Sequence, residues 1–377
     1  MRFAIVAGEP SGDLLGAGLM RALKSRDPDA VFLGVGGPLM QAAGLNSLVP
    51  FDRLAINGFR QPILRAPELL GIFRRVRAAT LEFAPDVFIG VDFNVFNLLL
   101  ERALKRHRVR TVHYVSPSVY AWRRGRLDRM RHSTDLMLTL FPFEAPLYHR
   151  RGIAAVFVGH PLADEIRVAG DRRAARACLG LDGAPLIALL PGSRMAEVAL
   201  MGDLFLRAAA AFTALRPGAR FVVACVDEKV QAAMRALLDA SSIADRTSLV
   251  VGASRLVVAA ADAALIKSGT GTLEAMLLER PMVVAYRLGR FTAMVVRRLL
   301  RTPHVALPNI LAGRRVVPEL LQEAATPGAL AAELATVLSP AKEASMLIEF
   351  RAIAVQLRRG ANAAAAEAVL AVARPPP

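Results

Sequence analysis

The chain has 377 residues, 54% of them hydrophobic and 6% aromatic, and its 48 Lys and Arg against 32 Asp and Glu give a net charge of +16. This length predicts two domains, and this balance excludes low-complexity disorder except at the Pro-rich end, 375–377. The positive charge favours a polyanionic partner, but the sequence lacks the reading helix and stacking aromatics of a nucleic-acid-binding protein. Because basic residues alternate with apolar ones, the anionic surface of a membrane is the favoured partner. The alternative is a solvated basic surface that binds no partner.

The cysteines and the N-terminus indicate a reducing compartment. Cys178 and Cys225 are the only two cysteines and lie far apart in the sequence, which predicts neither a disulfide framework nor a metal site. The first residues are too short for the apolar core of a signal peptide, and no apolar run approaches the roughly 18 residues that span a bilayer. We therefore expect a cytoplasmic protein with only peripheral membrane contact.

Short apolar runs alternate with amphipathic patterns along the whole chain, which is typical of parallel βαβ units. In the first half, helices are predicted at 13–24 and 96–106, and strands at 3–7, 31–35, 86–91, 111–115, 136–140 and 155–158. In the second half, strands are predicted at 186–190, 221–225, 248–251, 263–266 and 282–286. The strands are almost continuously apolar, so both faces of each sheet should be covered.

The break between the halves is expected after Gly159-His160-Pro161-Leu162, where a charged helical stretch, 171–178, follows the last strand. The sequence thus predicts an α/β fold of two doubly wound, Rossmann-like domains, residues 1–163 and 164–340, facing a central cleft where ligands bind at the carboxyl ends of the strands. Two further helical patterns, 341–358 and 362–373, predict that residues 341–377 pack back on the first domain.

One loop of the second half, which follows the strand at 186–190, has the composition of a phosphate site. Gly192 lets a ligand approach the backbone, and Ser193 can cap the next helix or donate its hydroxyl. Arg194 can form two parallel hydrogen bonds with a diphosphate. The loop has no Lys of a P-loop, and a dinucleotide-binding glycine fingerprint is absent from the chain.

A second loop of this type lies between another strand and helix and contains Ser268, Gly269 and Thr270. Its backbone N–H groups form an anion site, and Glu274, in the first helical turn, can accept the hydroxyls of a ribose. The alternative is that Ser268 and Thr270 only cap the helix and Glu274 completes a capping box. Two such loops in one half of the chain favour a nucleotide-diphosphate site.

Polar residues also end strands of the first half. Asp92 follows a buried strand and is a candidate general base toward a sugar hydroxyl; the alternative is that it accepts backbone hydrogen bonds where the next helix begins. His113 could orient a phosphate or a hydroxyl, although a hydrogen-bonded, half-buried histidine is the default. No His, Asp or Glu cluster has metal-ligand spacing. The candidates at these strand ends, besides Asp92, are Ser11, Gly12, Asp13, Asn94, His113 and Ser116.

Two basic-apolar segments, 61–77 and 286–301, bear on membrane contact. Each can lie in an interface with its apolar side chains immersed and its arginines on lipid phosphates. The alternative is a helix that packs on its own domain and has a basic outer face. The membrane-facing candidates are Ile63, Leu64, Leu69, Phe73, Arg74, Arg75 and Arg77.

Together these motifs resemble the lipid A disaccharide synthase family over nearly the whole chain. The collinear segments that carry the resemblance are 8–13, 85–92, 113–122, 141–144, 190–194, 268–274 and 307–309. The resemblance implies a GT-B architecture with an acceptor- and membrane-facing first domain and a UDP-sugar-binding second domain. It also implies an inverting, metal-independent transfer, without a cofactor, of 2,3-diacylglucosamine from its UDP derivative to 2,3-diacylglucosamine 1-phosphate through a β-1,6 bond.

The resemblance also implies roles for single residues. Asp92 matches the proposed base for the acceptor 6-hydroxyl, Arg194 would stabilise the departing UDP beside Ser193 and the 268–270 backbone, and Glu274 would hold the ribose. The remaining strand-end candidates would lie on the acceptor side, and the enzyme would contact the cytoplasmic leaflet of the inner membrane peripherally. A homodimer is compatible with these features.

The chain departs from the family pattern at three places. Phe93, Asn94 and Val95 follow Asp92 where the family commonly has a residue, Pro and a second Asp. Residues 57–61 read Asn-Gly-Phe-Arg-Gln where Met-Gly followed by Glu is usual, and Lys267 stands where a small residue is usual. Two alternatives therefore stay open: a paralogue that uses another lipid or sugar acceptor, and a catalytically silent membrane-associated relative.

Overall fold

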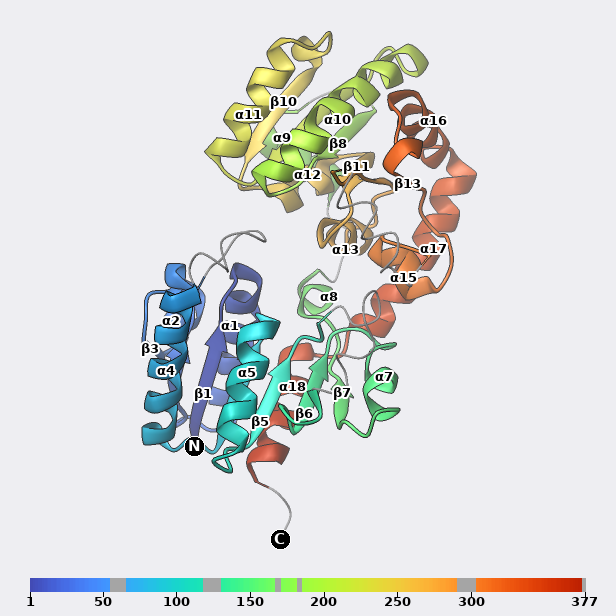
Figure 1. The fold of residues 1–377 in the computed structure, drawn as a ribbon. Helices are drawn as coiled ribbons and strands as arrows, with labels where there is room; N and C mark the ends of the chain where they lie inside the picture. The colour runs from blue at the N-terminus through green and yellow to red at the C-terminus, as the bar shows by residue number, and fades with distance from the viewer. Residues whose placement is uncertain (55–65, 118–129, 167–170, 182–184, 290–302, 375–377) are drawn as a thin grey trace. The chain divides into compact units, whose positions relative to one another are not determined.

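The structure is a computed structural model that describes residues 1–54, 66–117, 130–166, 171–181, 185–289 and 303–374. The chain divides into two compact units (Figure 1), Met1–Asp164 with Gln356–Pro377 and Glu165–Val355. Each unit has a parallel sheet with helices on both faces, so the predicted α/β class is confirmed.

The first unit contains a seven-stranded sheet in the order β3-β2-β1-β4-β5-β6-β7. Its strands are β1 (Arg2–Ala7), β2 (Val31–Val35), β3 (Leu45–Ser47), β4 (Val87–Val91), β5 (Thr111–Tyr114), β6 (Leu136–Thr139) and β7 (Ala155–Phe157). Every strand predicted in this half is present, and β3 is additional. Ala7 of β1 pairs with Val91 of β4, and Val91 with Tyr114 of β5, so these three strands end at one edge of the sheet.

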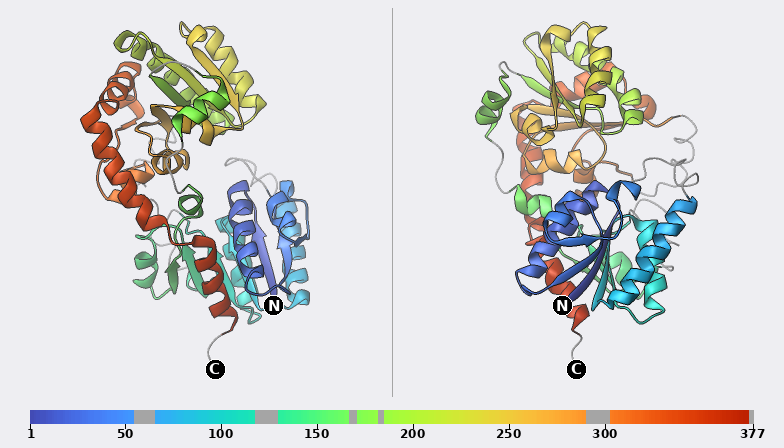
Figure 2. Two further views of the ribbon diagram at one scale, coloured as in Figure 1. Left: turned by 180° about the vertical axis from the view of Figure 1, so that it is seen from behind. Right: turned by 90° about the vertical axis from the view of Figure 1, so that its left-hand side faces the viewer.

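Helices cover both faces of this sheet (Figure 2). They are α1 (Pro10–Lys24), α2 (Pro38–Ala42), α4 (Ala66–Phe83), α5 (Asn94–Lys105), α7 (Ala145–His149), α8 (Pro161–Glu165) and α18 (Ala361–Ala373), with a 3-10 turn, η1 (Phe51–Arg53). On one face, α1 and α18 pack together over Phe3, Ile5 and Ile89. On the other face, α4 and α5 lie over Ala4 and Val6.

The apolar stripe of α4 faces the core of its own unit. Ile72 and Val76 are buried, Leu69 and Phe73 pack against the same cluster, and the Phe73 ring meets that of Phe96 edge-on at 5.7 Å. These residues recur at helical spacing and therefore share the one face that the sheet covers. Leu69 and Phe73, both half-buried, thus pack on the core of their own unit, as the alternative of a helix packed on its own domain predicts for α4. Membrane contact by this segment stays a prediction.

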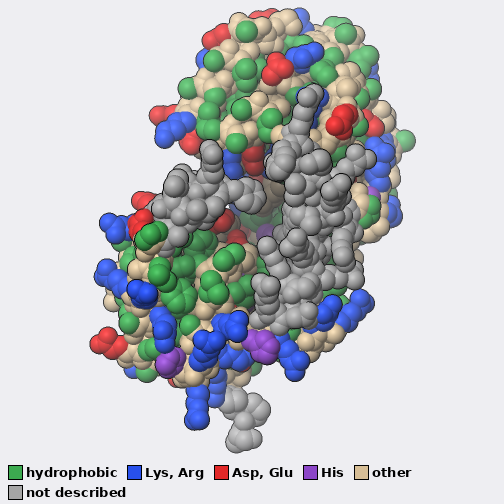
Figure 3. Space-filling view, in the orientation of Figure 1, with side chains coloured by type: hydrophobic (Ala, Val, Ile, Leu, Met, Phe, Trp, Pro, Cys, Tyr) green, Lys and Arg blue, Asp and Glu red, His purple; other side chains and the backbone are tan. Residues whose placement is uncertain are grey.

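The basic side of α4 is consistent with that alternative. Arg74 and Arg75 are exposed, and Arg77 is half-buried and forms a 2.8 Å hydrogen bond with the His107 ring. Figure 3 shows Lys, Arg and His side chains gathered at the end of this unit where α5 runs into β5. Ile63 and Leu64, and most of the second basic-apolar segment, lie outside the described residues.

The second unit contains a six-stranded sheet in the order β10-β9-β8-β11-β12-β13. Its strands are β8 (Leu186–Leu190), β9 (Arg220–Cys225), β10 (Thr247–Val251), β11 (Ala263–Lys267), β12 (Met282–Tyr286) and β13 (Glu319–Leu321). Its helices are α9 (Arg172–Leu179), α10 (Met195–Leu215), α11 (Glu228–Asp239), α12 (Ser254–Ala260), α13 (Gly271–Leu277), α15 (Leu307–Ala312), α16 (Pro327–Val337) and α17 (Pro340–Leu357), with 3-10 turns η3 (Ala244–Arg246) and η4 (Gln322–Ala324). The strand order reverses between β8 and β11, which is where ligands bind in sheets of this type.

The C-terminal helices differ from the prediction that residues 341–377 return to the first domain. The boundary between the units falls between Val355 and Gln356, so most of α17 belongs to the second unit and α18 to the first. Two ion pairs hold α17 to the second unit, Arg351–Glu279 at 2.6 Å and Glu349–Arg314 at 2.5 Å. Periodicity predicted both helices but could not indicate which core each one covers.

Among the described residues, helix α10 is the one helix that could cross a membrane by its length and composition. Glu197, Asp203 and Arg207 interrupt it, so it contains no apolar run of about 18 residues. It packs against α16 and α11, with Phe205 and Phe212 fully buried. Its apolar residues therefore build the core of the second unit.

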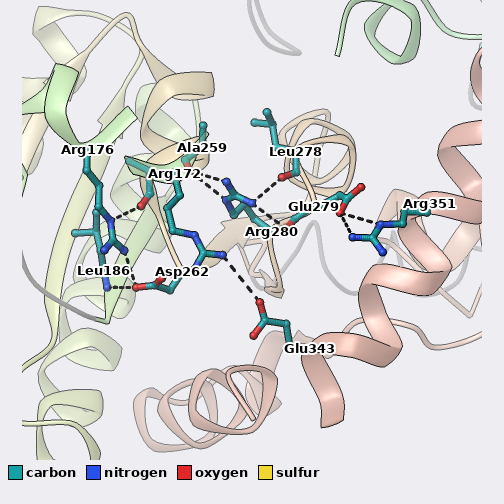
Figure 4. Close-up of polar contacts among 11 residues, drawn as sticks. Arg172, Arg176, Leu186, Ala259, Asp262, Leu278, Glu279, Arg280, Glu343 and Arg351 are labelled. Carbon is teal, nitrogen blue, oxygen red and sulfur yellow. Dashed lines mark hydrogen bonds and ion pairs between the residues drawn. The ribbon is translucent and has the colours of Figure 1, made fainter. Parts of the chain in front are cut away.

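A polar cluster at the amino ends of β8 and β11 links these two strands to α9 and α12 (Figure 4). The Asp262 carboxylate accepts hydrogen bonds from Arg172, Arg176 and the backbone N–H of Leu186, all at 2.7 Å. Nearby, the Arg280 guanidinium donates to the backbone carbonyls of Ala259 and Leu278. Since Asp262 is shared by three donors, it should contribute strongly to stability.

We expect Asp262→Ala to lower the free energy of unfolding of the second unit by about 2–4 kcal/mol, because it leaves two half-buried guanidinium groups and a backbone N–H without their acceptor. Urea denaturation followed by circular dichroism measures the change. Asp203→Ala is the matched control, since its ion pair with Arg207 spans 3.8 Å between two exposed side chains and should contribute less than about 0.5 kcal/mol. Equal effects of the two substitutions would contradict the assignment.

Candidate active site

A hollow of about 520 Å³ lies at the carboxyl ends of β8, β9 and β11 in the second unit. Its walls come from the loops that follow these strands, with further residues from the starts of α10, α12 and α13. The structure brings to this one pocket every donor-side residue that the sequence predicted: Gly192, Ser193, Arg194, Ser268, Gly269, Thr270 and Glu274.

The loop between β8 and α10 has a backbone that requires glycine. Gly192 has φ of +131°, and a Cβ at this position would lie 2.5 Å from a carboxylate oxygen of Glu197. The same carboxylate accepts the backbone N–H of Ser193 at 3.1 Å. Arg194, the N-cap residue of α10, is exposed and lines the pocket. The loop therefore presents a guanidinium at the N-terminus of a long helix, an arrangement that binds anions.

Lys267, at the end of β11, does not point away from this loop. Its ammonium lies 2.8 Å from Glu197 and 5.2 Å from the centre of the Tyr286 ring, and both members of the ion pair line the pocket. Burial alone would raise the pKa of Glu197, but Lys267 and the backbone N–H groups of Ser193 and Arg194 outweigh it and hold the pKa below its usual value. Glu197 was not among the predicted site residues.

We expect Lys267→Ala to weaken UDP binding about tenfold, because the Glu197 carboxylate would be left uncompensated beside an anion site. Isothermal titration with UDP measures the affinity. Lys229→Ala removes the same charge from the exposed face of α11 and is the control. The double variant Lys267→Ala with Glu197→Gln should recover part of the loss; unchanged affinity in the single variant would show that the pair does not act on the pocket.

The β11–α13 loop does not form the capping box that was the alternative interpretation. Thr270 is the N-cap residue but makes no side-chain cap hydrogen bond, and the Ser268 hydroxyl donates to the backbone carbonyl of Val305 at 2.8 Å. Glu274 accepts instead from the Arg255 side chain at 3.1 Å. The side chain of Ser268 and its backbone N–H, which donates to the Ala285 carbonyl at 3.1 Å, are thus both occupied within the protein. This loop can offer a ligand the backbone N–H groups of Gly269 and Thr270 and the Glu274 carboxylate.

In the first unit, Asp92 stands at the end of β4 in a left-handed backbone conformation, with φ of +49°. The side-chain amide of Asn97 fixes this turn by donating to the carbonyls of Val6, Val91 and Asp92. Phe93, not Asp92, is the N-cap residue of α5. Asp92 is therefore held at the sheet edge by its neighbours and does not serve as the cap of the helix.

The charge state of Asp92 depends on opposing effects. Burial raises the pKa of Asp92, whereas His113, the backbone N–H of Phe93 and the side chains of Ser11 and Asn94 favour the ionised form; the net pKa is raised. A carboxylate with a raised pKa at a strand end has the properties of a general base. Ser11 and Asn94, both acceptor-side candidates, thus contact Asp92 directly.

The other acceptor-side candidates have structural roles. Asp13 is buried and accepts the backbone N–H groups of Leu39 and Met40 at 3.0 Å, which holds the first turn of α2. At Gly12 a Cβ would come within 3.3 Å of the Val91 carbonyl, so this glycine permits packing of α1 on the sheet. The Ser116 hydroxyl is buried against the Tyr148 hydroxyl at 2.8 Å.

His113 is fully buried, not half-buried as expected. Its ring contacts Glu101 and Asn94, and no side of it is open to solvent. It cannot orient a substrate by touching it. Glu101, its buried partner on α5, was not singled out from the sequence. Among the residues that the structure describes, no group of three or more His, Cys, Asp or Glu side chains could hold a metal ion.

The fold is shared with solved proteins that handle nucleotide sugars. A putative UDP-N-acetylglucosamine 2-epimerase from Listeria monocytogenes aligns with a TM-score of 0.65 at 13% identity, covering 98% of this chain and 94% of that one. Anabaena HepE in complex with UDP and glucose aligns at 0.57 and 14%, covering 98% of each chain, and a spinosyn rhamnosyltransferase complexed with thymidine diphosphate at 0.58 and 19%, covering 96% and 97%. The two parallel-sheet units place this chain in the GT-B class.

Sequence comparison narrows the class to one family. Residues 3–372 match the family model described as lipid-A-disaccharide synthetase. The lipid-A-disaccharide synthase of Pseudomonas aeruginosa (strain UCBPP-PA14) is 50% identical over 373 residues, covering 98% of this chain and 97% of the relative. That of Pseudomonas putida (strain W619) is 49% identical over 369 residues, with the same coverage. The chain belongs to the lipid-A-disaccharide synthase family.

Proposed function

We propose that this chain is an inverting hexosyltransferase that makes the lipid A disaccharide. It transfers 2,3-diacylglucosamine from its UDP derivative to the 6-hydroxyl of 2,3-diacylglucosamine 1-phosphate, and it releases UDP. The observation that carries the proposal is the second-unit pocket, which unites both phosphate-type loops and Glu274 in a chain about 50% identical to lipid-A-disaccharide synthases over nearly its whole length.

In the proposed reaction the acceptor 6-oxygen attacks the anomeric carbon of the donor, and the bond from that carbon to the UDP oxygen breaks. The hydroxyl proton passes to the Asp92 carboxylate. The negative charge that develops on the diphosphate is stabilised by the Arg194 guanidinium and the backbone N–H groups of Gly269 and Thr270. Attack from the face opposite to UDP converts an α-linked donor into a β-1,6-linked product.

The test is to incubate purified protein with this donor and acceptor and to follow UDP together with the disaccharide 1-phosphate. We expect the two products in equal amounts, with the β configuration shown by the anomeric proton coupling. Release of UDP only with a different lipid or sugar acceptor would replace this function by that of a paralogue. Absence of turnover with any acceptor, while UDP still binds, would indicate a silent relative.

We further propose that the protein works at the cytoplasmic face of the inner membrane through peripheral contact. Support comes from the exposed Arg74 and Arg75, from the basic side chains gathered at one end of the first unit (Figure 3), and from the acyl chains that both proposed substrates carry. Flotation with vesicles that contain anionic lipid should recover the protein at low salt and lose it at high salt. Equal recovery with neutral vesicles would argue against an electrostatic contact.

A further inference from the structure

A line of four polar side chains runs from the partly exposed Asp92 into the core of the first unit. The Asn94 amide donates to Asp92 Oδ1 at 3.0 Å, and Asn94 Oδ1 lies 3.1 Å from His113 Nε2. His113 Nδ1 in turn lies 2.6 Å from Glu101 Oε1, and the last two side chains are fully buried. The line joins the end of β4, the start of α5, β5 and the middle of α5.

The chemistry of these groups fixes the direction of the hydrogen bonds. Because Asn94 turns its NH₂ group to the Asp92 carboxylate, its oxygen faces His113 and must accept a hydrogen from Nε2. Nδ1 and Glu101 Oε1 then share the remaining proton, either as imidazolium and carboxylate or as imidazole and carboxylic acid. Both arrangements are neutral overall, which a buried pair requires.

The surrounding fold is built to keep this pair buried. At Gly90, a Cβ would lie only 2.2 Å from Glu101 Oε1, so the strand makes room for the carboxylate. Glu101 Oε2 is buried without a hydrogen-bond partner among the residues that the structure describes. An unsatisfied buried oxygen costs about 1–3 kcal/mol, which an apolar residue at this core position would avoid. The cost points to a role for the pair other than stability.

The charged groups that influence this line of side chains are few and lie close to it. Burial raises the pKa of Glu101 to about 7; His113 and Lys105 oppose the rise and Asp135 adds to it. Asp92 is influenced by His113, Ser11, Asn94 and the backbone N–H of Phe93. The His113–Glu101 pair is therefore the ionisable pair that lies behind Asp92 in the core.

We propose that Asn94, with the His113–Glu101 pair behind it, is a positioning device that holds Asp92 as an oriented carboxylate ready to accept the acceptor proton. The inference rests on the proposed function, since it assumes that Asp92 is the base. The Nε2 hydrogen of His113 fixes the Asn94 amide, and the amide fixes the plane of the Asp92 carboxylate. His113 and Glu101 are fully buried and therefore act only through Asn94 and Asp92.

The test measures kcat and KM for Asn94→Ala, His113→Ala and His113→Gln between pH 5 and 9. Asn94→Ala removes a donor that favours the ionised form of Asp92, so the acidic limb of the kcat/KM profile should move to higher pH by about one unit. Loss of orientation should lower kcat about 10- to 100-fold, whereas the KM for the UDP donor stays unchanged. His113→Gln, whose amide can replace Nε2 as the donor to Asn94, should retain more activity than His113→Ala.

Two comparisons make the outcome decisive. Leu99→Ala, on the exposed side of α5, is the control for a change to this helix and should leave rate and pH profile as they are. If His113→Ala lowers the melting temperature, Asn94→Ala, a partly exposed position, carries the test alone. A wild-type kcat and acidic limb in Asn94→Ala, with Asp92→Asn inactive, would overturn the positioning device and leave the base intact. Activity in Asp92→Asn would instead overturn the proposed base.

Discussion

Asp92→Asn should abolish sugar transfer and leave the binding of UDP nearly unchanged. The amide keeps the size of the carboxylate and can still accept from Asn94, but it cannot take the acceptor proton, and loss of a general base costs about 10²–10⁴-fold in rate. The pocket proposed for UDP lies in the second unit, and Asp92 is not among the residues that line it. Turnover numbers and titration of UDP, measured on the same preparation, separate the two effects.

The pH dependence of the wild-type enzyme provides a further check on this residue. Only the ionised carboxylate can accept a proton, so transfer should increase as pH rises through the pKa of Asp92, which burial raises. The rise should be missing from the residual activity of Asp92→Asn. Asp203→Asn, an exposed carboxylate on α10, is the control and should keep both rate and profile. Retained transfer in Asp92→Asn would mean that another group is the base.

Arg194→Ala should lower kcat about 10²–10³-fold and weaken UDP binding about tenfold. The guanidinium stands at the N-terminus of α10. In the proposed reaction it supplies positive charge where the departing diphosphate becomes more negative, so its loss should affect the transition state more than the ground state. Arg194→Lys should recover only part of the rate, because an ammonium cannot form the two parallel hydrogen bonds of a guanidinium.

The control for Arg194 lies on the same helix. Arg207 is exposed, and its ion pair with Asp203 lies within α10 itself, so Arg207→Ala removes an equal charge without touching the pocket. Single-turnover and steady-state rates distinguish loss of chemistry from slower release of UDP. A tenfold rise in KM with an unchanged kcat would assign Arg194 to binding alone.

The main parts of the fold were predictable because the central strands of these sheets are covered on both faces. Such strands are continuous apolar runs, as β4 and β8 show, and they stand out in any sequence. The edge strands β3 and β13 are only three residues long and include polar or partly exposed positions, so no such run marks them. Their pairing with β2 and β12 depends on neighbours distant in sequence.

The donor pocket could be predicted because short loops carry its signals in consecutive residues, such as Gly192-Ser193-Arg194. The rest of the pocket depends on residues that are distant in sequence: Glu197 pairs with Lys267, which lies 70 positions later. In the first unit the same limit applies to Asp13 and Ser116. A pattern at a strand end could not indicate that Asp13 accepts backbone N–H groups of α2 or that Ser116 pairs with the Tyr148 hydroxyl. Likewise, the apolar residues of α4 recur with the same spacing whether the helix packs on a sheet or on lipid, so the sequence could not distinguish the two environments.

The first unit draws its last helix from the far end of the chain, and this has a consequence for how the protein is made. Ala365, Ala366 and Val369 of α18 are fully buried against the sheet that begins with β1. On the ribosome, the part of this face that α18 covers stays open until the whole of the second unit has been synthesised, although α1 is already available for the rest of the face. The unit that starts translation is therefore the last to complete its native core.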